Sequence, residues 1–143
     1  MATLRTVNEA MSRPIGRTDA PLAGVAILLV DDDREARRRA AVALEAWGAI
    51  VVGVGSAEEA RQSFQSVIPT VVVTALDQPG LDSAWLLQQI RELPADKGGR
   101  VPIVAFSASL QSREQIRAAG FHDVIGKPID PVELCAVITW TLA

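Results

Sequence analysis

Short apolar runs and amphipathic segments alternate along this chain. Each apolar run ends abruptly at polar residues, as strands buried on both faces of a parallel sheet do. The predicted strands span residues 25–30, 50–54, 70–75, 102–107 and 124–125.

The segments between the strands place apolar residues at helical spacing. Predicted helices span residues 34–47, 56–67, 83–93 and 111–119, and a last helix begins at Pro131. Local signals mark some of their ends, because a glycine follows the first helix and a capping-box pattern opens the second. Strands that alternate with helices predict an α/β fold, in which a doubly wound parallel sheet is covered on both faces through right-handed crossovers.

The composition fits one folded domain. The chain has 143 residues, of which 49% are hydrophobic, too many for a disordered protein. Residues 1–22 lack apolar periodicity and are predicted to be a flexible tail or linker, which leaves residues 23–143 as the domain.

Several classes of function are disfavoured by the same composition. No apolar run approaches the roughly 18 residues of a membrane helix, and the net charge of −3 comes without a basic stripe for nucleic acid. The N-terminus lacks a secretory pattern, and the single Cys135 cannot form an internal disulfide. We therefore expect a cytoplasmic protein that binds neither membranes nor nucleic acid.

Three adjacent acids, Asp31, Asp32 and Asp33, follow the first predicted strand. Ligand sites in doubly wound folds lie at the C-terminal ends of strands, and adjacent carboxylates need a cation or a basic partner. Magnesium, which prefers oxygen ligands, is a candidate for Asp31 and Asp32. A solvated acidic turn is the alternative, and for Asp33 we prefer a helix-capping role.

Two further strand ends carry polar side chains. Pro128 restricts Lys127 to an extended conformation, which can aim its ammonium group into a site at the strand ends. Ser107 ends the fourth strand, where its hydroxyl can bond a phosphoryl oxygen or simply cap the loop. Each of these residues alone is common on a protein surface, so only their combination indicates a site.

Together and in this order, the motifs resemble the receiver domains of two-component response regulators. The resemblance covers about residues 24–142. Residues 25–33 look like the first strand and acidic pair of that family, 106–108 like the end of its fourth strand, and 126–130 like its lysine–proline signature. Residues 93–102 are similar to receivers attached to hybrid histidine kinases. The resemblance implies a flavodoxin-like fold with five parallel strands in the order 2-1-3-4-5.

In that family the third strand ends in the phosphoacceptor aspartate. Here Pro69 and Pro79 both point to position 75 as its equivalent, and that residue is Ala75. An alanine offers neither a nucleophile nor a metal ligand, so phosphoryl transfer in the usual geometry is excluded.

The resemblance assigns roles to the remaining site residues. It makes Asp31 and Asp32 magnesium ligands, with the backbone carbonyl of Asp77 as a third, and it places Ser107 and Lys127 against the phosphoryl group. Magnesium binding should be weakened, because the alanine removes a charged ligand. Asp77 also stands as an alternative acceptor, two residues beyond the usual position.

These features favour a signalling receiver without enzymatic turnover that acts through protein contacts. The expected partner is a histidine kinase, a histidine phosphotransfer protein or another signalling protein, and a homodimer through the face of the fourth helix, fifth strand and fifth helix is a further expectation. The alternative is a magnesium-dependent phosphoacceptor whose aspartate was mutated to Ala75. A small phosphatase or nucleotide-binding enzyme is disfavoured, since the chain has no phosphate-cradling glycine loop.

Overall fold

Five parallel strands form one sheet in the order β2-β1-β3-β4-β5. This computed structural model describes residues 20–143 except 77, 79–80 and 109–112, and the predicted strand order and α/β class are confirmed. The strands are β1 (Ala26–Val30), β2 (Ile50–Val54), β3 (Val71–Ala75), β4 (Ile103–Ser107) and β5 (Asp123–Gly126).

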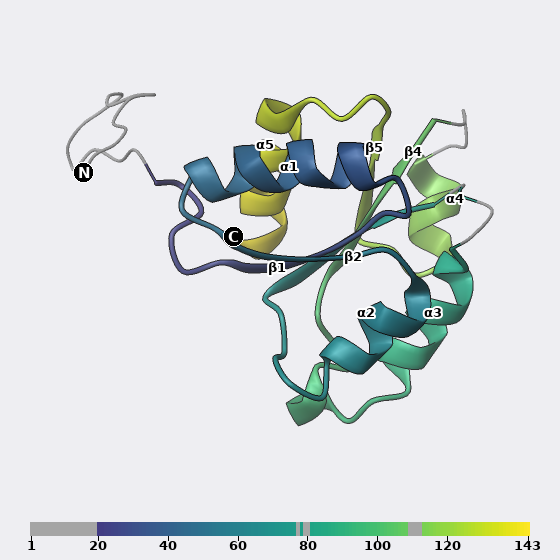
Figure 1. Cartoon of the computed structure of the whole chain (residues 1–143). Helices are drawn as coiled ribbons and strands as arrows, with labels where there is room; N and C mark the ends of the chain where they lie inside the picture. The colour runs from purple at the N-terminus through teal and green to yellow at the C-terminus, as the bar shows by residue number, and fades with distance from the viewer. Residues whose placement is uncertain (1–19, 77, 79–80, 109–112) are drawn as a thin grey trace.

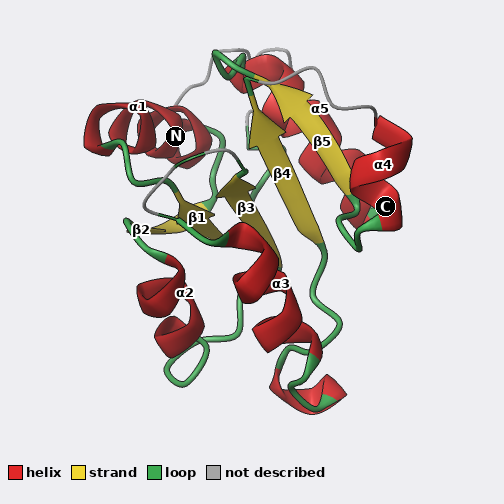
Figure 2. Cartoon of the chain, turned by 90° about the vertical axis from the view of Figure 1, so that its right-hand side faces the viewer, coloured by secondary structure: helices red, strands yellow, loops and turns green. Residues whose placement is uncertain are grey.

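Helices cover both faces of the sheet. In Figure 1, α1 and α5 lie on one side of it and α2 and α3 on the other, with α4 beside β5; Figure 2 shows the same layers from the side. The helices are α1 (Arg34–Ala46), α2 (Ala57–Ser63), α3 (Ser83–Arg91), α4 (Arg113–Ala118) and α5 (Pro131–Leu142), with a 3-10 turn η1 at Ala95–Lys97.

The apolar residues form two clusters, one on each face of the sheet. One cluster joins alternate strand residues to α2, α3 and α4, and includes Phe64, Ile90 and Ile116. The other joins the intervening strand residues to α1 and α5, and includes Phe106 and Leu134. Strands β3 and β4 are buried along their whole length, as their continuous apolar runs predict.

Most predicted boundaries differ from the observed ones by one or two residues, and two differences are larger. Helix α2 ends at Ser63 rather than near residue 67, and residues 95–97 form a 3-10 turn that the sequence analysis does not predict. The β-branched pair Val67 and Ile68 stands before Pro69, and both features disfavour continuation of a helix. The hydroxyl of Ser63 donates to the carbonyl of Ala60, which closes the last turn.

The packed core begins slightly before the expected domain boundary. Most of the predicted tail lies outside the described residues, but Leu22 is fully buried and its N–H donates to the carbonyl of Trp47 at 2.9 Å. Leu22 therefore belongs to the folded domain. Within the part of the chain that the structure describes, no helix combines the length and apolar character needed to cross a membrane.

Candidate functional site

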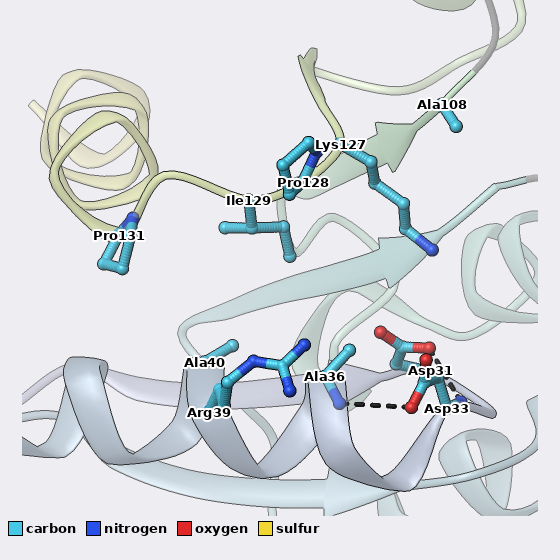
Figure 3. Close-up of a pocket in the computed structure, with 10 residues that line it drawn as sticks. All are labelled: Asp31, Asp33, Ala36, Arg39, Ala40, Ala108, Lys127, Pro128, Ile129 and Pro131. Atoms are coloured by element: carbon cyan, nitrogen blue, oxygen red, sulfur yellow. Dashed lines mark hydrogen bonds between the residues drawn. The ribbon is translucent and has the colours of Figure 1, made fainter.

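The C-terminal ends of four strands meet at one edge of the sheet. The register pairs Val30 with Thr74, Ala75 with Phe106 and Ser107 with Gly126, so these strands end at nearly the same level. The residues that the sequence analysis selected at positions 31, 75, 107 and 127 are thus brought to one edge. Figure 3 shows Lys127 extending toward Asp31 across a cavity.

Asp31 is the most buried of the described acids at this edge, with 1% of its surface exposed. Its Oδ1 accepts hydrogen bonds from the backbone N–H of Asp33, at 2.9 Å, and from the side-chain amide of Gln78. Its backbone carbonyl accepts from Arg37 Nη1 at 2.7 Å. Among the described residues, Oδ2 of Asp31 has no hydrogen-bond partner, so one buried carboxylate oxygen remains open to a cation or a donor.

The two neighbouring acids lie at the surface and differ in role. Asp33 caps α1, because its Oδ1 accepts from the N–H groups of Glu35 at 3.1 Å and Ala36 at 3.2 Å. This confirms the predicted cap. The backbone N–H of Asp32 donates to Oε1 of Gln78 at 2.8 Å.

Gln78 is the site residue that the sequence analysis missed. Its carboxamide contacts Asp31 and Asp32, which lie 47 and 46 positions away in the sequence. No local periodicity or motif marks such a side chain, so its role appears only once β1 and β3 are side by side.

Ala75 is the last residue of β3 and is completely buried. It belongs to the apolar cluster beneath α1 and α5, and its methyl group offers neither a nucleophile nor a metal ligand. Asp77, predicted as a backbone ligand and as an alternative acceptor, lies outside the described residues.

Ser107 and Lys127 lie side by side at the ends of β4 and β5. Ser107 is 3% exposed, and its carbonyl accepts from the N–H of Lys127 at 3.1 Å. The ammonium group of Lys127 lies 5.1 Å from the centre of the Phe106 ring, where the negative ring face attracts a cation. Within the described residues Lys127 forms no ion pair with Asp31 or Asp32, so the aromatic ring is its observed partner.

A cavity of about 630 Å³ opens beside these residues. Asp31 and Lys127 lie at its polar end, while Ala36, Ala40 and Ile129 form apolar walls contributed by α1 and the loop before α5. The cavity gives solvent and small molecules access to the edge of the sheet where the strand ends meet.

The model of the response regulator receiver domain matches residues 27–139. The chain belongs to this family. It is 37% identical over 121 residues to an uncharacterized 14.6 kDa protein of Leptolyngbya boryana, covering 82% of this chain and 89% of that protein. It is 30% identical over 122 residues to the response regulator Rre1 of Synechocystis, covering 83% of this receiver but only 52% of Rre1.

A solved structure adds to the comparison. The receiver domain of the sensor histidine kinase PA1611 from Pseudomonas aeruginosa, solved with a magnesium ion coordinated in its active-site cleft, has a TM-score of 0.73 and 28% identity. The match covers 84% of this chain and 98% of that receiver. Receivers are signalling modules rather than classical enzymes, and the PA1611 receiver holds magnesium in its own active-site cleft.

The residues of this receiver fit a magnesium ion poorly. Among the described residues there is no group of three or more His, Cys, Asp or Glu that could hold a metal. Ala75 contributes no ligand, and Oδ1 of Asp31 is already engaged by two donors. Magnesium demands near-octahedral oxygen coordination. The described residues alone do not supply it, although Oδ2 of Asp31 is available.

Asp123, at the start of β5, is a further polar residue that the sequence analysis did not select. It is 8% exposed, and its carboxylate lies 3.1 Å from Arg113 Nε and 3.6 Å from Arg117 Nη2. These ion pairs attach α4 to β5. They therefore help to fix the face of α4, β5 and α5.

His122 lies just before β5, and its titration is expected to make the stability of the fold depend on pH. Partial burial, and then the charge of Arg91, lower its pKa below the ordinary value of 6.5. The unfolded chain therefore binds a proton before the folded one, and stability should fall as the pH drops below about 6.5. The slope is shallow, since the residue is largely exposed.

Thermal unfolding between about pH 7.5 and pH 5.5 measures this effect. The variant His122→Gln should lose less stability over that interval than the unaltered chain. Equal losses in the two proteins would show that other groups are responsible.

Proposed function

We propose that this receiver is a phosphorylation-incompetent signalling module that acts through protein–protein contacts. The observation that carries the proposal is Ala75, which is fully buried at the end of β3 and has neither a nucleophilic oxygen nor a charge. Phosphoryl transfer to a protein requires a nucleophile at the reacting position. Magnesium binding at the same edge is weak in this proposal, because a carboxylate ligand is missing.

The partner is a histidine kinase, a histidine phosphotransfer protein or another signalling protein. A similar receiver is described as part of a sensor histidine kinase, which supports this class of partner. Exposed apolar side chains suited to protein contact occur on the helices that cover one face, with Trp140 80% and Val132 66% exposed on α5 and Val42 58% exposed on α1. The homodimer through α4, β5 and α5, and the cytoplasmic location, remain part of the proposal.

A second candidate is a magnesium-dependent phosphoacceptor in which Ala75 replaces an aspartate by mutation. The rest of the strand-end arrangement favours it, since Asp31, Ser107 and Lys127 are all present at the same edge. The codon at position 75 of the natural gene distinguishes this candidate from a receiver that has lost its acceptor.

The test of incompetence is incubation of the chain with acetyl phosphate and magnesium, followed by intact mass measurement. We expect no gain of a phosphoryl group, because no carboxylate stands at the acceptor position. A stoichiometric gain would overturn the proposal and would make Asp77 the first residue to replace by asparagine.

A further inference from the structure

The carboxamide of Gln78 joins the two leading acids of the site. Its Nε2 donates to Oδ1 of Asp31, and its Oε1 accepts from the backbone N–H of Asp32 at 2.8 Å. The backbone N–H of Asp33 donates to the same oxygen of Asp31 at 2.9 Å. The groups that hold the acidic turn are thus the neutral carboxamide of Gln78 and a backbone N–H. A side chain from beyond β3 thus holds the turn that follows β1.

Only a primary amide of this length satisfies both contacts at once. A glutamate would keep the acceptor toward Asp32 but would turn an oxygen, in place of an N–H, toward Asp31. A methionine would fill similar space and make neither hydrogen bond. The position therefore carries a chemical requirement that size alone does not meet.

Hydrogen bonds to Oδ1 of Asp31 also offset the repulsion between the adjacent acids. A buried carboxylate is stabilised by hydrogen bonds to its charged form, and Asp31 receives two of them on Oδ1. Asp32 is exposed and remains hydrated. The remaining charge on Oδ2 of Asp31 faces the cavity, on the side toward which Lys127 extends (Figure 3).

We propose that Gln78 is a positioning residue that holds the acidic turn and makes the fold of this site independent of divalent cations. The proposal rests on the proposed function, since a receiver that takes no phosphoryl group has no need to exchange the amide for a metal. It assigns the poor fit to magnesium to two residues, Ala75 and Gln78.

The variant Gln78→Glu tests this proposal in the full chain. It places a second carboxylate directly against that of Asp31, so the thermal midpoint without divalent cations should fall by about 5 °C. Magnesium chloride at constant ionic strength should restore it, because the new carboxylate supplies a metal ligand. The unaltered chain should show no magnesium-dependent shift.

The matched control is Gln65→Glu, the same change of charge on an exposed residue of the turn after α2. It should behave like the unaltered chain. If magnesium raises the midpoint of the unaltered chain as much as that of Gln78→Glu, the proposal fails. It fails equally if Gln78→Glu neither loses stability nor responds to magnesium.

A second variant covers the case in which Gln78→Glu does not fold. Gln78→Met adds no charge, and hydrogen exchange at the Asp32 amide should become about fivefold faster, as expected for loss of one ordinary hydrogen bond. Unchanged exchange would overturn the proposal. These readouts are separate from phosphoryl uptake. If the unaltered chain takes up no phosphoryl group but its thermal midpoint rises with magnesium, only the role of Gln78 is overturned. If it takes up a phosphoryl group, the proposed function is overturned.

Discussion

The variant Ala75→Asp should take up one phosphoryl group from acetyl phosphate when magnesium is present, whereas the unaltered chain takes up none. Position 75 ends β3 beside the end of β1, where a carboxylate would lie close to Asp31. It would supply the nucleophilic oxygen that attacks phosphorus as acetate leaves, and a third acid for the cation. Intact mass measurement with and without magnesium checks both parts of the expectation.

The same substitution should cost stability when no cation is present. Ala75 is completely buried, and a carboxylate there is desolvated and lies near a second acid. We expect a loss of about 1–3 kcal/mol in the free energy of unfolding, with partial recovery in magnesium. Urea unfolding at two magnesium concentrations measures it.

The control for both effects is Ala75→Asn. Asparagine has nearly the same size as aspartate but carries no charge and no nucleophilic carboxylate. It should take up no phosphate and should show no recovery in magnesium. If Ala75→Asp also stays unmodified, position 75 is not the sole defect, and a rearranged acidic turn becomes the explanation. Uptake by the asparagine variant would place the acceptor elsewhere in the chain.

Most of the fold follows from patterns that act locally. The continuous apolar runs of β3 and β4 match strands buried on both faces, and Asp33 caps α1 as expected. Ser56 accepts from the N–H of Glu59 at 3.1 Å, while Glu59 reaches back to the N–H of Gly55 rather than to that of the cap itself. Such signals operate within a few residues, so one sequence suffices to detect them.

The site was harder to predict, because its contacts join distant segments. The convergence of the strand ends follows from the parallel topology, but Gln78 meets Asp31 across 47 positions and has no pattern that marks it. The sequence predicts that Lys127 aims its ammonium group into the site at the strand ends, but it does not predict that this group lies over Phe106. Which of two available partners a flexible side chain selects depends on packing that the sequence alone does not display.

Phe106 links the core to the site, and Phe106→Ala should be the most destabilising of the substitutions considered. The ring is fully buried between the sheet and the helices α1 and α5. Its face also contacts the ammonium group of Lys127 in a cation–π interaction. Removing it should cost about 3–5 kcal/mol, a large share of the 5–15 kcal/mol that typically stabilises a domain. Urea unfolding followed by circular dichroism gives the value.

The control Phe106→Leu separates packing from the contact with Lys127. Leucine keeps much of the buried volume and should cost far less than alanine, but it removes the aromatic face, which contributes about 0.5–1 kcal/mol. Adding Lys127→Met to each protein completes a double-mutant cycle. A coupling energy near zero would show that the ring serves the core alone. A favourable coupling energy would mean that the Phe106 ring holds the ammonium group of Lys127, and that loss of the ring frees this charge to pair with Asp31.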